Sequence, residues 1–204
     1  NIAICDFGIS DEFVRPINTV DSFSIDPLTS IIATLDTLRK GEIAIFQILF
    51  KGITSPLVSE IPYAVSDGRG GSFFEAAPEM VMCAKEKIET SLFSVVMRIA
   101  SQGNSDRTSQ SIATELARNI TKISESSYNA LIPLSNEGYN YDFHEYNLNH
   151  RLSNRFGFIL NTKELTTFLH YPNKSVISQK LGLSGGKTKQ APKTVIHQKY
   201  LLGT

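Results

Sequence analysis

A chain of 204 residues, of which 41% are hydrophobic and 20% charged, has the composition of a globular protein and suits one substantial domain or two small ones. Its 20 Lys and Arg residues balance its 20 Asp and Glu residues, which disfavours a module that binds nucleic acid through a basic surface. No stretch reaches the ~18 apolar residues of a membrane span, and no charged segment followed by an apolar run marks a signal peptide. We therefore expect a cytoplasmic protein without a membrane span.

Three elements are predicted at the start of the chain. Residues 1–25 alternate short apolar runs with turn-forming residues and predict one or two short strands. Asp26 and Pro27 are typical of a helix start, and apolar residues at helical spacing follow them: Leu28, Ile31, Ile32, Leu35 and Leu38. Gly41 is expected to stop this helix in a left-handed conformation. Residues 42–51 then form an apolar run of strand length.

The next part of the chain predicts a loop, a helix and a strand. Residues 52–74 contain Pro56, Pro62 and a glycine-rich run at 67–71, a composition typical of a loop. A helix is predicted at about residues 77–88. Residues 92–99 form a nearly continuous apolar run, which is typical of a strand at the centre of a sheet.

A longer helix and a final strand of the first domain follow. Ser105 or Asp106 is expected to cap the helix, whose apolar residues keep helical spacing: Ile112, Leu116, Ile120 and Ile123. Residues 129–134 are expected to return as a strand. The combination predicts an α+β fold with a split β-α-β, ferredoxin-like sheet and helices on one face.

The C-terminal third is divided into two predicted segments after a sheet domain at residues 1–135. Residues 136–172 are expected to be irregular except for a short helix, in which Asn161 and Glu164 form a capping-box pattern and Pro172 follows the end. The apolar face of this helix is expected to be Leu165, Phe168 and Leu169. Residues 173–204 are rich in Gly, Ser, Lys and Pro and predict an extended arm or linker with apolar anchors: Val176, Ile177, Leu181, Val195 and Ile196.

A glycine-rich run at residues 182–188 is the strongest candidate for a nucleotide site. A phosphate-binding loop has the pattern GxxxxGK[ST], in which backbone N–H groups surround the phosphates and the lysine reaches them. The first glycine of that pattern would stand at position 181, which is Leu181. Pro192 would also obstruct the helix that must follow the loop. We therefore predict a linker without bound nucleotide or other cofactor.

Residues 137–151 contain candidate side chains for metal or nucleic-acid binding. His144 and His150 are six residues apart, whereas the zinc motif HExxH places its two histidines four residues apart on one helix face. Tyrosines in this segment could stack on single-stranded bases, but acidic residues are interleaved with them: Glu137, Asp142 and Glu145. The pattern favours a polar surface segment. The chain also lacks the GxSxG pattern of a serine nucleophile, so no catalytic residue is assigned.

The two cysteines of the chain are candidates for a disulfide or a metal site. Cys5 and Cys83 are far apart and neither has a neighbouring cysteine. This spacing indicates buried thiols in a reducing compartment and disfavours a disulfide framework or a zinc site.

Residues 159–172 (ILNTKELTTFLHYP) resemble a stretch found in bacterial HerA/FtsK-superfamily ATPases, which are related to the ATPases of conjugation and type IV secretion. Residues 175–181 and 187–192 (SVISQKL and KTKQAP) are similar to the continuation of that stretch, and residues 202–204 to the opening of the ATPase module. Upstream, residues 26–28 and 41–47 fit the strand–helix–strand pattern of the same region.

The resemblance implies that the nucleotide-binding and Mg²⁺-binding residues of such a motor lie beyond Thr204. It implies that this chain is a non-catalytic assembly and docking region, with its own downstream ATPase module and neighbouring subunits of a ring as partners. The balanced charge and the acidic residues within 137–151 disfavour DNA contact by this chain. The alternative from the residues alone is a separate enzyme or ligand-binding domain that uses the loops at 52–75 or 137–151.

Overall fold

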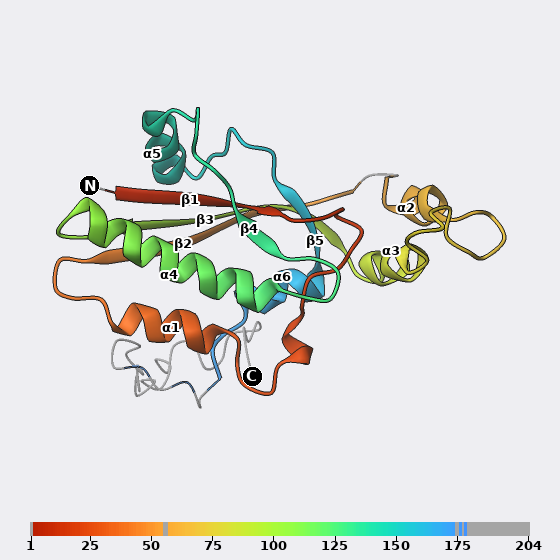
Figure 1. Cartoon of the computed structure of the whole chain (residues 1–204), viewed down its shortest axis with the longest axis horizontal. Coiled ribbons are helices and arrows are strands. Elements are labelled where there is room, and N and C mark those ends of the chain that lie inside the picture. The colour runs from red at the N-terminus through yellow and green to blue at the C-terminus, as the bar shows by residue number, and fades with distance from the viewer. Residues whose placement is uncertain (1, 55–56, 174–175, 177, 179–204) are drawn as a thin grey trace, which may run out of the picture.

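The computed structural model describes residues 2–54, 57–173, 176 and 178. Within them an antiparallel sheet is combined with helices (Figure 1), which confirms the predicted α+β class. The strands are β1 (Ile2–Ile9), β2 (Ile43–Gly52), β3 (Leu92–Gln102), β4 (Leu131–Pro133) and β5 (Phe158–Asn161). The helices are α1 (Leu28–Asp36), α2 (Leu57–Val65), α3 (Met80–Ile88), α4 (Asp106–Ser124), α5 (Tyr141–His150) and α6 (Thr162–Leu169), and a short 3-10 helix at Val20–Ser22 precedes α1.

Strand β3 lies at the centre of the sheet, as its apolar sequence predicts. The strand order is β2-β3-β1-β4, and β5 also pairs with β3. On one side β3 pairs with the whole length of β2. On its other side it pairs with β1 at residues 98–102 and with β5 at residues 92–95. Strands β1 and β2, which α1 connects in sequence, therefore flank β3.

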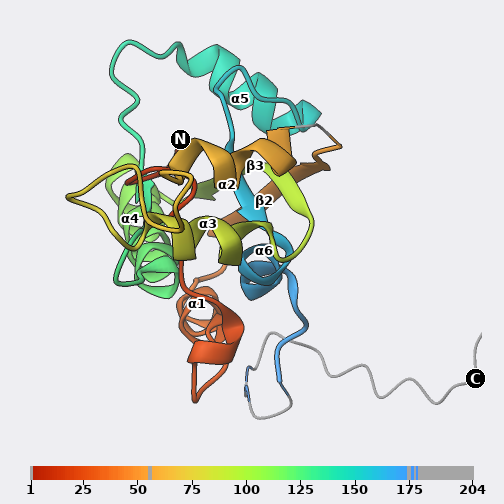
Figure 2. The same ribbon diagram turned by 90° about the vertical axis from the view of Figure 1, so that its right-hand side faces the viewer.

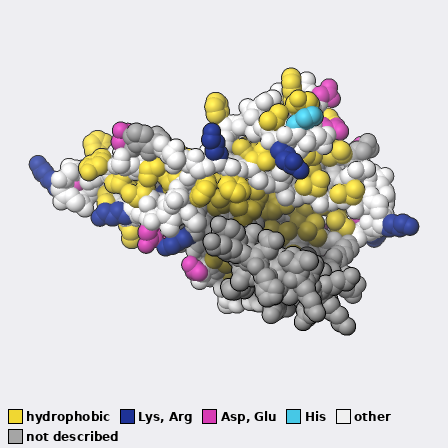
Figure 3. All heavy atoms as spheres, turned by 180° about the vertical axis from the view of Figure 1, so that it is seen from behind, with side chains coloured by type: hydrophobic (Ala, Val, Ile, Leu, Met, Phe, Trp, Pro, Cys, Tyr) yellow, Lys and Arg dark blue, Asp and Glu magenta, His cyan; other side chains and the backbone are white. Residues whose placement is uncertain are grey.

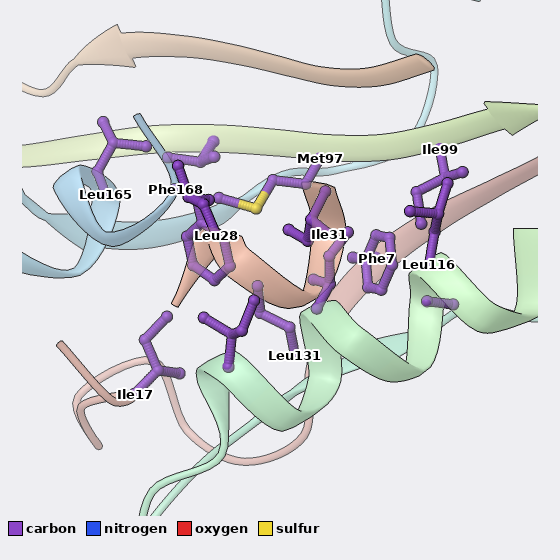
Figure 4. Close-up of a cluster of buried hydrophobic side chains, with 14 of the residues drawn as sticks. Phe7, Ile17, Leu28, Ile31, Met97, Ile99, Leu116, Leu131, Leu165 and Phe168 are labelled. Carbon is purple, nitrogen blue, oxygen red and sulfur yellow. The ribbon is translucent and has the colours of Figure 1, made fainter. Parts of the chain in front are cut away.

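The main core lies between one face of the sheet and helices α1, α4 and α6 (Figures 1 and 4). Alternate residues of β3 point into it, because side chains of a strand alternate between the two faces. Val95, Met97 and Ile99 are fully buried there. The helices contribute the stripes that the sequence predicted: Leu28, Ile31 and Ile32 from α1; Ile112, Leu116, Ile120 and Ile123 from α4; Leu165 and Phe168 from α6.

Helix α5 covers the opposite face of the sheet (Figure 2), so the prediction of helices on one face only was wrong. Its Leu148 packs against Ile4 of β1 and Ala100 of β3, whose side chains point away from the main core. Few apolar residues take part in this second cluster. The sequence therefore gave little periodic signal for the helix, and its 141–150 segment was wrongly expected to be irregular.

The segment at 52–74 is another correction, because residues 57–65 form α2 despite the internal Pro62. Ile61 and Val65 of α2 are buried against Cys83 of α3, and this packing compensates for the hydrogen bond that proline cannot donate. After α2, residues 66–74 contain neither a helix nor a named strand, as the loop prediction expected. There Gly68 and Gly70 have φ values of 76° and 95°, which glycine adopts readily. Together α2 and α3 form a lobe inserted between β2 and β3 (Figure 1).

The segment that precedes α1 agrees with the prediction of one or two short strands, whereas the segment that follows α5 differs from its prediction. Residues 10–25 contain the 3-10 helix and no strand, so β1 is the only strand before α1 among the described residues. Residues 158–161 form β5, which was not predicted. Strand β5 and helix α6 join the same sheet and core as the elements before residue 135.

The predicted helix signals are largely confirmed at the level of single hydrogen bonds. The Asp26 carboxylate accepts the N–H of Leu28 at the start of α1. The Ser105 side chain accepts the N–H of Thr108 at the start of α4, and Asn161 and Glu164 form the complete capping box of α6. Two details differ. Helix α1 ends at Asp36, so Gly41 (φ 91°) lies in the turn before β2, and Leu169 is 45% exposed instead of lying on the buried face.

Among the described residues no helix is long and apolar enough to cross a membrane. Of the predicted arm anchors, Val176 is partly buried against the main core. The other anchors, Ile177, Leu181, Val195 and Ile196, lie outside the described residues, as does the glycine-rich run at 182–188.

Candidate functional site

The most concentrated set of charges is buried between the sheet and α5. The Asp6 carboxylate lies 2.7 Å from Nε2 of His144, 3.3 Å from Nε of Arg98 and 3.4 Å from Nε of Arg155. Asp6, Arg98 and His144 are each at most 2% exposed. The strand register brings Asp6 and Arg98 together, since the two residues stand directly opposite each other in the β1–β3 ladder.

Helix α5 and the chain around it supply the remaining groups of this Asp6 cluster. The ring of Tyr139 lies 4.6 Å from the ring of His144 and 4.3 Å from the guanidinium carbon of Arg155. The side chain of Gln47 on β2 donates to the carbonyl of Leu148 in α5. Four buried polar atoms of the cluster have no hydrogen-bond partner within the described residues: Oδ1 of Asp6, Nε and Nη1 of Arg98, and Oε1 of Gln47.

The Asp6 cluster is best interpreted as the attachment of α5 to the sheet. Four hollows of about 400 to 560 Å³ on the described surface are lined by residues other than Asp6, Arg98 and His144. No group of three metal-ligating side chains occurs among the described residues. His144 and His150 are separated, with the first buried and the second exposed. The prediction of a surface position was therefore wrong for His144.

A second buried ion pair joins α3 to α6. Nζ of Lys87 lies 2.7 and 2.9 Å from the two carboxylate oxygens of Glu164, and both side chains are fully buried. The same carboxylate accepts the backbone N–H of Ile17 and of Asn161. Burial raises the pKa of Glu164 and lowers the pKa of Lys87, because both charged forms lose solvation. The ion pair therefore connects α3 to α6 inside the fold, and neither side chain is exposed at the surface.

A third ionic contact holds the chain that follows α6. Asp26 accepts Nε2 of His170 at 3.0 Å and the backbone N–H of Asn173 at 2.6 Å. Burial acts to raise the pKa of Asp26, but the hydrogen bonds from Asn173, His170 and Leu28 outweigh it and hold the pKa below its ordinary value. The carboxylate is therefore favoured in the folded state.

This contact predicts an acid-sensitive stability. A carboxylate whose folded pKa is depressed stabilises the fold above its unfolded pKa of about 3.9, and the contribution is lost as the pH falls through the folded pKa. We expect thermal unfolding of an Asp26→Asn variant to depend less on pH than that of the wild type below about pH 4. Equal pH dependence in the two proteins would contradict the assignment.

The outer edge of β1 is closed by side chains and backbone of the following segment. The carbonyl of Asp6 accepts the N–H of Leu134, that of Ile4 accepts Nδ2 of Asn136, and that of Ile2 accepts the hydroxyl of Tyr141. A paired or covered edge cannot serve as a template for another strand. This edge of the sheet is therefore not a docking site.

The outer edge of β2 is open along the described part of the chain. β2 is ten residues long, and among the described strands it pairs with β3 alone. Just after β2, Ile53 donates its N–H to Leu92 of β3. Because an antiparallel ladder alternates, odd-numbered residues of β2 direct their backbone groups toward β3 and even-numbered residues direct theirs outward. The outward residues are Ala44, Phe46, Ile48 and Phe50.

Apolar side chains flank these outward backbone groups. Ile43 and Ile45 on the α5 face are 52% and 45% exposed, and Phe50 on the other face is 52% exposed. Seen from behind, apolar side chains gather in a band across the middle of the molecule (Figure 3). No charged residue lies between Glu42 and Lys51. A long, apolar, unpaired edge strand is a site at which another strand can add to the sheet.

Other sequence-level candidates have ordinary structural roles. The segments at 52–75 and 137–151, considered as loops for an enzyme site, contain α2 and α5. Cys83 is buried and Cys5 is partly buried, and neither forms a disulfide. Burial, together with the charge of Asp6, raises the pKa of Cys5 to about 11, so its thiol is protonated near neutral pH. The open edge of β2 was missed, because strand order cannot be read from one strand's sequence.

Comparison with known proteins identifies no relative. No family model matches the chain, and no curated protein and no solved structure does so.

Proposed function

We propose that this chain is a non-catalytic assembly and partner-docking region of a HerA-type ring ATPase that moves DNA in transfer, repair or defence. The observation that carries the docking role is the open apolar edge of β2. An added strand would satisfy its outward backbone groups and cover Ile43, Ile45 and Phe50. The buried ionic groups, by contrast, are engaged in joining elements of the fold.

The architecture supports an interaction module. The strand order β2-β3-β1-β4, with α1 connecting β1 to β2 and α4 connecting β3 to β4, supports a ferredoxin-like arrangement. Residues 173–204 would form the extended arm of the proposal. Its first contacts are those of Asn173 with Asp26 and of Ser178 with Asp36.

The link to a ring motor is supported by the resemblance of residues 159–192 and 202–204 to the region before the ATPase module. In this proposal the partners are the downstream ATPase module and neighbouring subunits of a cytoplasmic homo-oligomer such as a hexamer. The balanced charge of the chain gives it no electrostatic attraction for DNA. The reading frame after Thr204 tests this part: a GxxxxGK[ST] motif is expected there, and its absence would remove the link to an ATPase.

A substitution on the edge of β2 tests the docking role. Ile45→Lys places a charge on the open edge at a position that is already 45% exposed, so the fold should be retained while strand addition is opposed. The matched control is Ile132→Lys, a 38% exposed residue of β4 at the opposite end of the sheet order. Native mass spectrometry of the full-length assembly should show loss of subunits only for Ile45→Lys. Equal effects of both variants, or none, would contradict docking through β2.

A further inference from the structure

We infer that the partner of the β2 edge is a second copy of this chain, paired with it antiparallel about a two-fold axis. This inference rests on the proposed docking role and names the occupant of the edge. A two-fold axis perpendicular to the sheet makes any edge strand antiparallel to its own copy and keeps each face of the sheet on the same side. The pairing would join two sheets into one.

The backbone pattern restricts the registers that are allowed. Only the even-numbered residues of β2 have outward backbone groups, so hydrogen-bonded pairs must join even residues of the two copies. One such register places Phe46 opposite Ile48 of the second copy and Ala44 opposite Phe50. A shift by a single residue would place inward-facing residues at the junction and turn the side chains to the wrong faces.

The side chains favour this register over its neighbours. It sets the large, half-exposed Phe50 beside the small Ala44, and on the α5 face it sets the exposed Ile45 beside Leu49. Of the two neighbouring registers, the one with Phe46 on the axis would set the charged Glu42 against Phe50. The one with Ile48 on the axis would set Phe46 against Phe50 and the charged Lys51 against Ile45. The favoured register therefore keeps charge away from Phe50, and the charged Lys51 lies opposite Ile43 only at the ends of the joint ladder.

Electrostatics do not oppose the association. Residues 43–50 carry no charge, and the chain has a formal net charge of zero. Glu42 precedes the run and Lys51 follows it, so antiparallel pairing brings one carboxylate and one ammonium group to each end of the joint ladder. Parallel pairing would instead bring like charges together at both ends. The edge is thus complementary to itself.

Disulfide trapping tests the register directly. In the favoured register Gln47 lies on the axis and faces Gln47 of the second copy in a pair without backbone hydrogen bonds, for which Cα atoms are about 4.5 Å apart. This separation is within the roughly 4.4–6.8 Å that a disulfide spans. Gln47→Cys should therefore form a covalent dimer under mild oxidation. Ile45→Cys is the control, since Ile45 would lie about 13 Å along the strand from its own copy.

A backbone substitution tests the pairing without cysteine. Phe50→Pro removes an outward N–H, whereas Phe50→Ala removes the same aromatic ring and keeps the N–H. Sedimentation equilibrium of the 204-residue chain should show a monomer–dimer equilibrium that Phe50→Pro weakens about tenfold or more relative to Phe50→Ala. Circular dichroism melting should show that both variants remain folded.

The outcomes separate this inference from the proposed function. A chain that stays monomeric across the micromolar range, or an Ile45→Cys dimer as abundant as that of Gln47→Cys, would overturn pairing with a second copy. If a monomeric chain still bound a separately expressed ATPase module and lost that binding in Ile45→Lys, the docking role would stand with a different occupant. Oxidised wild-type protein should give no dimer, because Cys83 is buried and Cys5 is partly buried.

Discussion

Replacing Glu164 with alanine is expected to lower the free energy of unfolding by about 3–5 kcal/mol. The carboxylate is fully buried and accepts Nζ of Lys87 and the backbone N–H groups of Ile17 and Asn161. Its removal would leave a buried ammonium group without a counter-charge and two N–H groups without acceptors. Urea denaturation should show a lower midpoint with an unchanged m value.

A neutral double variant is the control for this prediction. Burial raises the pKa of Glu164 and lowers that of Lys87, so the intact pair already bears a large desolvation cost. Lys87→Met combined with Glu164→Gln removes both charges and retains an oxygen acceptor for the backbone groups. It should be more stable than Glu164→Ala. A double variant that is equally unstable would show that the cost does not come from the unpaired ammonium group.

Replacing Asp6 with alanine is expected to cost about 3–5 kcal/mol and, in addition, to release α5 from the sheet. The guanidinium group of Arg98 is 1% exposed and would lose its carboxylate. His144 would lose its 2.7 Å hydrogen bond, which is a principal contact of α5 with the sheet. Amide hydrogen exchange measured along the chain should accelerate in residues 141–150 more than in α4, which is held by extensive apolar packing.

A compensating substitution separates the two effects of Asp6. Arg98→Met in the Asp6→Ala background removes the unpaired buried charge and should restore part of the global stability. It does not restore the contact with His144, so exchange in α5 should remain fast. If the double variant regained slow exchange in α5, or if Asp6→Ala left α5 unchanged, the proposed attachment would be wrong.

Elements with a regular apolar stripe could be predicted from the sequence, whereas α5 and α2 could not. Helix α4 has apolar residues at helical spacing and a serine cap, and both features are confirmed. Helix α5 buries only His144, Asn147 and Leu148, a pattern with no apolar periodicity. In α2, Pro62 gave a misleading signal for a loop, because the packing that stabilises this helix comes from α3.

Contacts between polar side chains could be predicted only where the two residues are close in the sequence. The pairing of Asn161 with Glu164 is local, because the partner lies three positions after the cap, and the sequence predicted it. The contact of Asp6 with His144 joins residues 138 apart in the chain, so no spacing rule could anticipate it. The contact of Lys87 with Glu164 joins residues 77 apart.

The α+β class, the principal helices, the central position of β3 and the caps could be predicted from the sequence, because these depend on periodicity and on hydrogen bonds between near neighbours. The tertiary structure decided which charges meet in the interior and which edge of the sheet stays open. The sequence of β2 predicts a strand whether it lies at the centre or at the edge of a sheet. Only the strand order shows that β3 pairs with one edge of β2 and that no described strand pairs with its other edge. The physical reason is that edge exposure and buried ion pairs depend on contacts between residues far apart in the chain.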